Sequence, residues 1–90
     1  MPRLERIFLI VNTLGLHARA AAQLVQTANR FRSSVHVEKD GTDVNGKSIM
    51  GVLTLAAAKG TRISVVCEGD DAEAAMASLA ALIEAGFGEK

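Results

Sequence analysis

The sequence lacks tryptophan and tyrosine, contains only three phenylalanines, and has no excess of positive charge. Lysine plus arginine and aspartate plus glutamate both number 10, so no basic field attracts a phosphate backbone, and few rings are present on which bases stack. Nucleic acid is therefore not expected as a partner. No apolar run approaches the roughly 18 residues of a bilayer span, and the opening MPRLER lacks the apolar segment of a signal peptide. We expect a cytoplasmic protein that is not inserted in a membrane.

Cysteine is also scarce, since Cys67 is the only one. A single cysteine cannot form an internal disulfide, and a lone thiol commonly packs as a small buried hydrophobe, so a redox role is not expected. No CxxC pair or histidine-rich cluster provides metal ligands, and neither a metal nor another cofactor is expected. The 90 residues are 49% apolar and contain no linker, repeat or low-complexity segment. Residues 1–90 are therefore expected to form one domain with a modest core.

Apolar residues in the first half of the chain recur with periods typical of strands and helices. Residues 4–11, LERIFLIV, are rich in β-branched side chains and predict a strand buried largely on both faces. Apolar residues at helical spacing over 18–31 predict an amphipathic helix of about four turns. Residues 35–38 alternate valine with polar side chains, which predicts a strand whose polar residues, His36 among them, face solvent. Asp40-Gly41 then predicts a tight turn into a short strand at 42–44.

The second half repeats this alternation. A helical pattern resumes from Ser48, and residues 62–68 alternate as a fourth strand. Asp70 with Glu73 resembles a capping box, and the helix that follows is expected to end at Gly86. The element order is βαββαβα, which one sheet with its helices on a single face satisfies. We expect an α+β two-layer sandwich whose other sheet face is partly solvated.

A histidine and an arginine lie one residue apart where the first helix is expected to begin, in the stretch GLHARAAA. If the helix begins at Ala18, His17 occupies the N-cap, although Asn, Asp, Ser and Thr are the preferred caps. The backbone amides of Ala18 and Arg19, the helix dipole and the Arg19 guanidinium favour an anion there. Imidazole is a competent nucleophile near neutral pH, so His17 is a candidate for carrying a phosphoryl group. A surface histidine without a chemical role is the open alternative.

Two segments, GLHARAAAQLVQTA and, further along, VNGKSIMGVLTLAAAKG, resemble the signature segments of HPr, the histidine-containing phosphocarrier protein of the phosphoenolpyruvate-dependent phosphotransferase system. The resemblance covers essentially the whole chain and includes the βαββαβα order. It implies an HPr-like open-faced β-sandwich, in which a four-stranded antiparallel sheet carries three helices on one face. It also implies a phosphoryl carrier rather than an enzyme in its own right.

The resemblance assigns roles to individual residues. His17 would accept phosphate through Nδ1 from the phosphohistidine of enzyme I and donate it to a histidine or cysteine of an enzyme IIA or IIB domain. Arg19 would steady the phosphoryl group. The residues implied to form an apolar docking patch around the site are Leu16, Ile49, Met50 and Leu53. Apolar residues at helical spacing are core by default, so a core role for the last three stays open.

Ser48 corresponds to the serine that HPr kinase/phosphorylase modifies in many bacteria, and KSIMGVL resembles the form that this kinase recognises. The alternative is that Ser48 is only a helix N-cap. A phosphate on Ser48 would add about 1.5 to 2 negative charges as a stable ester, which suits a lasting switch. A regulatory module that docks through phosphorylated Ser48 on a transcription factor or enzyme is therefore the second function considered. A small ligand-binding domain is disfavoured, because no pattern indicates a pocket.

One position departs from the family pattern. The family usually has proline where this chain has Ala20, at about the third helical position. Alanine restores a backbone donor facing the anion but gives the unfolded chain more freedom, an effect of about 0.4 to 1 kcal/mol. The departure leaves the nucleophile intact. It leaves open whether the protein serves the sugar-transport branch or the nitrogen-related branch.

Overall fold

The structure is a computed structural model and describes residues 1–89. Strands and helices follow one another in the predicted βαββαβα order. The elements are β1 (Arg3–Leu9), α1 (Ala18–Ala28), β2 (Ser34–Lys39), β3 (Thr42–Asn45), α2 (Ile49–Thr54), β4 (Arg62–Glu68), α3 (Ala72–Glu84) and a short turn η1 (Gly86–Gly88). No helix within residues 1–89 is both long and apolar enough to cross a bilayer.

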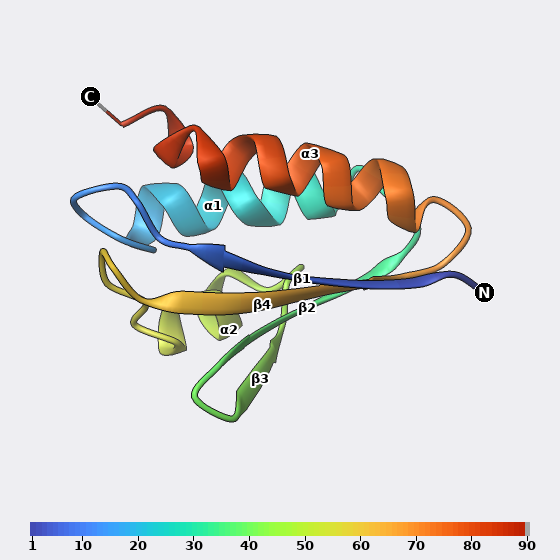
Figure 1. The fold of residues 1–90 in the computed structure, drawn as a ribbon, viewed down its shortest axis with the longest axis horizontal. Helices are drawn as coiled ribbons and strands as arrows, with labels where there is room; N and C mark the ends of the chain where they lie inside the picture. The colour runs from blue at the N-terminus through green and yellow to red at the C-terminus, as the bar shows by residue number, and fades with distance from the viewer. Residues whose placement is uncertain (90) are drawn as a thin grey trace.

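The four strands form one antiparallel sheet in the order β1-β4-β2-β3. Helices α1 and α3 lie together over one face of this sheet (Figure 1). The short helix α2 packs against α1 and β3, and its Val52 belongs to the same buried core as the two longer helices. The α+β architecture with three helices on one face of the sheet is therefore confirmed.

The central strands β2 and β4 alternate as the sequence predicts. Their inward side chains are fully buried against the helices and are Val35, Val37, Ile63, Val65 and Cys67. The opposite face carries half-buried and exposed polar side chains, namely His36, Glu38, Arg62 and Ser64. Burial raises the pKa of the Cys67 thiol, which keeps it protonated and unreactive at neutral pH. The turn between β2 and β3 has positive φ at Asp40 and Gly41, as its sequence predicts.

The prediction that the first strand is buried on both faces is wrong. β1 lies at the edge of the sheet and pairs only with β4. Phe8 is its one fully buried residue, whereas Ile7 is 68% exposed and Leu9 is 50% exposed. An apolar β-branched run fits a buried strand and an open edge equally well, because its periodicity says nothing about which neighbours cover it.

The first helix is shorter than predicted. It buries the expected side of the helix, but it ends at Ala28 and leaves Phe31 beyond it, half-buried. The chain tightens after Ala28, since Arg30 N donates to Thr27 O and Phe31 N donates to Ala28 O over three residues instead of four. Phe31 still packs against the core, and so it continues the apolar period without belonging to the helix.

The predicted capping box of Asp70 and Glu73 is also wrong. The N-cap of α3 is Asp71, and its side chain makes no hydrogen bond to the helix. The Asp71 carboxylate instead accepts from Arg32 N, Ser33 N and the Ser33 hydroxyl, which belong to the segment between α1 and β2. The Ser33 hydroxyl and these two amides lower the pKa of Asp71 to about 2. Asp71 therefore fastens a distant segment to the start of α3.

We expect Asp71→Asn to lower stability at neutral pH, because the charge that faces three donors is removed. The folded-state pKa of Asp71 lies below its ordinary 3.8, so its stabilisation is complete at higher pH and is lost as the pH falls toward about 2. The difference in urea midpoint between wild type and Asp71→Asn should shrink from about pH 5 to about pH 2. Asp70→Asn is the control. A similar pH-dependent loss in that variant would contradict the assignment to Asp71.

Candidate functional site

His17 stands at the predicted start of the first helix. It is the N-cap of α1, with extended backbone angles and a half-buried side chain that makes no capping hydrogen bond. The first bond of the helix runs from Ala21 N to His17 O at 2.8 Å. The amides of Ala18, Arg19 and Ala20 consequently have no partner inside the helix. Three backbone donors and the positive end of the helix dipole therefore lie next to the imidazole.

The loop before His17 is held by a close contact with the loop after α2. Leu16 N donates to Ala57 O at 2.8 Å. Gly15 has a φ of +66°, and a Cβ on it would lie 2.4 Å from the same Ala57 oxygen. Only glycine allows this approach. The packing of the Gly15–Leu16 backbone against Ala57 therefore determines where the imidazole stands.

Leu16 does not belong to an exposed docking patch, contrary to the role that the family resemblance implies. Its side chain is 3% exposed and belongs to the core cluster. The hydrogen bond from Leu16 N to the Ala57 carbonyl turns the residue inward, although the next residue in sequence is half-exposed. Leu16 therefore anchors the loop that presents His17.

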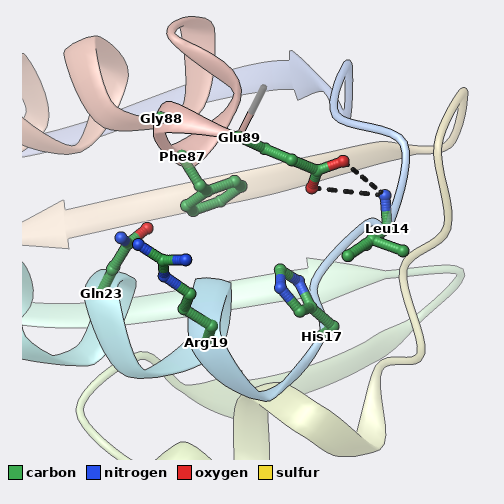
Figure 2. Close-up of a pocket in the computed structure, with 7 residues that line it drawn as sticks. All are labelled: Leu14, His17, Arg19, Gln23, Phe87, Gly88 and Glu89. Carbon is green, nitrogen blue, oxygen red and sulfur yellow. Dashed lines mark hydrogen bonds between the residues drawn. The ribbon is translucent and has the colours of Figure 1, made fainter.

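His17 and Arg19 line the same pocket, which has a volume of about 400 Å³ (Figure 2). The remaining lining residues are Leu14, Gln23, Phe87, Gly88 and Glu89. Arg19 is exposed, and the ion pairs recorded within residues 1–89 do not include it. The predicted histidine and arginine are thus brought together in an open pocket that the sequence did not indicate.

The imidazole of His17 has one contact that bears on its chemistry. Its Nδ1 lies 3.1 Å from the carbonyl oxygen of Gly15. A neutral ring that makes this hydrogen bond donates from Nδ1–H, and its lone pair is then on Nε2. The Nδ1 nucleophile implied by the family resemblance requires the ring to release this carbonyl.

Glu89 is a site residue that the sequence reasoning missed. Its carboxylate accepts from Asn12 Nδ2 at 2.9 Å. It also accepts from Leu14 N at 3.2 Å (Figure 2). The Asn12 side chain, the Leu14 amide and the charge of protonated His17 together hold the pKa of Glu89 below its ordinary value, and partial desolvation opposes them. The two glycines around Phe87 signalled a special turn in this segment, but nothing local indicated its partner.

Ser48 stands at the start of the short helix α2, which packs against α1. Ser48 is the N-cap of α2, and its Oγ accepts from Gly51 N at 3.1 Å. Met50 is 74% exposed and Ile49 is also exposed, whereas Leu53 is half-buried and packs against the core. Met50 and Ile49 are therefore not core residues, whereas Leu53 is partly in the core.

Comparison with known proteins identifies the family. Residues 4–85 match the family model described as PTS HPr component phosphorylation site. The chain belongs to the HPr family. HPr proteins are phosphocarriers of the phosphotransferase system rather than catalytic enzymes, and a phosphohistidine and a link to sugar transport follow from membership. The phosphocarrier protein HPr of Neisseria meningitidis is 54% identical over 80 residues, which are 89% of this chain and 90% of the relative.

Two further comparisons bear on the fold and on regulation. A crystal structure of HPr from Thermoanaerobacter tengcongensis matches with a TM-score of 0.93 and 48% identity, covering 97% of this chain and 98% of that chain. The HPr-like protein Crh of Halalkalibacterium halodurans is 53% identical over 70 residues, which are 78% of this chain and 83% of the relative. The chain is therefore similar both to phosphocarrier proteins and to the HPr-like protein Crh.

We expect Gly15→Ala to destabilise the protein more than Gly41→Ala. Both glycines have positive φ, so alanine at either position is strained by about 1 to 2 kcal/mol. A Cβ at Gly15 also meets the Ala57 oxygen, whereas nothing lies within 4 Å of one at Gly41. Urea unfolding of the two variants isolates the cost of this collision. Equal losses of stability in the two variants would show that the collision with the Ala57 oxygen adds no cost.

Proposed function

We propose that residues 1–90 form one phosphocarrier domain that accepts a phosphoryl group on His17 from phosphorylated enzyme I and passes it to enzyme IIA or IIB domains. The observation that carries this proposal is the half-exposed imidazole at the first turn of α1, in one pocket with Arg19. Membership of the HPr family supports the same role. The work of such a carrier takes place in the cytoplasm, where its donor and acceptors meet it.

The chemistry requires little from the carrier itself. An imidazole nitrogen attacks the phosphorus of the donor phosphohistidine, the new N–P bond forms as the old one breaks, and the electron pair returns to the donor ring. The phosphoryl oxygens would face the amides of Ala18, Arg19 and Ala20 and the Arg19 guanidinium. Helix-terminal interactions of this kind contribute about 0.3 to 1 kcal/mol per charge. This is enough to orient a phosphate without trapping it.

The docking surface is proposed to lie beside the site. Ile49 and Met50 expose apolar side chains on α2, and Leu53 contributes its accessible part. Leu14, which is exposed and lines the His17 pocket, would add a further apolar side chain next to the imidazole. Enzyme I and the enzyme II domains would cover the same apolar residues in turn, which suits a shuttle that meets each partner briefly.

We expect His17→Ala to abolish phosphorylation of the protein by enzyme I. Radiolabelled phosphoenolpyruvate, magnesium and enzyme I should place an acid-labile phosphate on the wild-type chain, because a phosphohistidine N–P bond hydrolyses readily in acid. His36→Ala is the matched control, since His36 is exposed on the opposite face of the sheet and should leave labelling unchanged. Label that persists in His17→Ala would overturn the proposal.

A regulatory role through Ser48 is the second candidate, and the similarity to Crh favours it. A phosphate on Ser48 would stand at the start of α2, next to the exposed Ile49 and Met50. Its charge would alter the apolar surface proposed for docking and repel an incoming phosphohistidine. HPr kinase/phosphorylase would supply this modification, and a transcription factor or enzyme would bind the modified form.

We expect Ser48→Asp to slow labelling of His17 by enzyme I about tenfold, because a negative charge at the docking surface disfavours the encounter by roughly 1.4 kcal/mol. Ser48→Asn provides the control, since asparagine also caps helices but carries no charge. Initial rates at several ionic strengths test the electrostatic origin, and the gap between the two variants should narrow with salt. Undiminished labelling of Ser48→Asp would argue against an inhibitory switch.

A further inference from the structure

The segment after α3 adopts an unusual backbone conformation. Gly86, Phe87 and Gly88 have φ values of 63°, 58° and 69°, so three successive residues lie in the left-handed region. Glycine tolerates this conformation, whereas Phe87 is strained in it. The Phe87 side chain is 5% exposed, and the burial of its apolar surface offsets this strain. The turn therefore persists and directs the next residue toward the loop before α1.

The Glu89 carboxylate lies against that loop and accepts hydrogen bonds from two of its N–H groups. Its Oε2 accepts from Asn12 Nδ2 at 2.9 Å, and its Oε1 accepts from Leu14 N at 3.2 Å. Asn12 is 5% exposed, and its Nδ2 also donates to Gly15 O at 2.8 Å. Both N–H groups of this buried amide are therefore committed to acceptors, which fixes its orientation. Glu89 thus holds two points of the loop that presents His17.

A continuous line of polar contacts leads from this carboxylate to the imidazole. Asn12 links Glu89 to the Gly15 carbonyl, and that carbonyl lies 3.1 Å from His17 Nδ1. We propose that Glu89 is a positioning residue for His17, acting through the Asn12 amide and the Gly15 carbonyl. The proposal rests on the phosphoryl-acceptor role of His17 and assigns a function to the segment after α3.

The arrangement answers a requirement of the transfer step. When Nδ1 forms its bond to phosphorus, the ring carries its proton on Nε2, and the donor to the Gly15 carbonyl is lost. The Asn12 Nδ2–H still satisfies that carbonyl, and Glu89 holds Asn12 in place. The loop can therefore release the imidazole without leaving an unpaired oxygen or shifting its backbone. Misplacement of a reacting group by about 1 Å can cost about 10²-fold in rate, so this rigidity matters.

The experiment compares Glu89→Gln with Glu84→Gln in the full chain. Both remove one carboxylate near the end of α3, but Glu84 faces Arg6 and does not line the His17 pocket. We expect Glu89→Gln to reduce the rate of His17 labelling by saturating phosphorylated enzyme I about tenfold, with less change in half-saturation. Nitrogen NMR of the His17 ring should show a shift toward the tautomer protonated on Nε2, because a loosened Gly15 carbonyl holds the Nδ1 proton less well. The rate still falls, because the loss of ring position outweighs the freer Nδ1 lone pair. Glu84→Gln should match wild type in both measurements.

A role in folding alone predicts a different result. Glu89→Gln would then lower the urea midpoint but leave the labelling rate and ring tautomer of the folded protein at wild-type values, and this outcome would overturn the proposal. A second test adds Glu89→Gln to the Asn12→Ala variant. If Glu89 acts on the ring through Asn12, Glu89→Gln should have no further effect on the ring in this background. Additive effects would likewise reject the route through Asn12.

The two proposals fail in distinguishable ways. If wild type takes no label from enzyme I, the phosphocarrier role of His17 is rejected, whereas the tautomer measurement still reports whether Glu89 orients the ring. If wild type is labelled and Glu89→Gln behaves identically in both measurements, only the positioning role is rejected.

Discussion

The close approach of two loops determines where the His17 side chain stands. The loop before α1 passes so near the Ala57 carbonyl that Gly15 has no room for a Cβ, and the adjacent Leu16 amide donates to that same oxygen. Leu16 is buried as a result, and α1 begins two residues later with His17 as its N-cap. A side chain on a flexible loop would lose orientation with every encounter, whereas here the backbone on either side of it is packed. The imidazole is consequently both accessible and held in position.

Modest stabilisation of the phosphate suits a carrier better than tight binding. The groups near His17 that favour an anion are backbone amides at a helix terminus and one exposed guanidinium, Arg19, whereas the Glu89 carboxylate in the same open pocket disfavours one. A deeply buried anion site would strengthen these interactions, but it would also raise the barrier to handing the phosphoryl group on. It would equally obstruct partners that approach over Leu14 and Met50. In the proposed transfer, weak local stabilisation and an apolar rim would let the partner supply the remaining groups that the transition state needs.

Local patterns predicted the helices and the central strands, because side-chain period and terminal residues are properties of a short stretch of chain. The position of His17 was predictable for the same reason. The exposure of β1 depended on which strand lies beside it, and the partner of Asp71 lies 38 residues away in sequence. Glu89 meets Asn12 across 77 residues, through a left-handed turn at Phe87 that no propensity favours. These features arise from tertiary packing, and sequence periodicity carries no information about them.

Ala20, at the third position of α1, shows that the helix can begin after His17 without the proline that the family usually has there. Proline at this third helical position would fix φ and remove an amide that has no partner in the helix. Alanine keeps the amide and so adds a donor beside the imidazole, at a cost of about 0.4 to 1 kcal/mol in unfolded-chain entropy. The helix nevertheless begins at the residue after His17, because the Leu16 contact with Ala57 and the full burial of Ala20 determine its start. A chain whose helix start is set by tertiary contacts does not need proline for that purpose, and it gains one hydrogen-bond donor toward the phosphate proposed for His17.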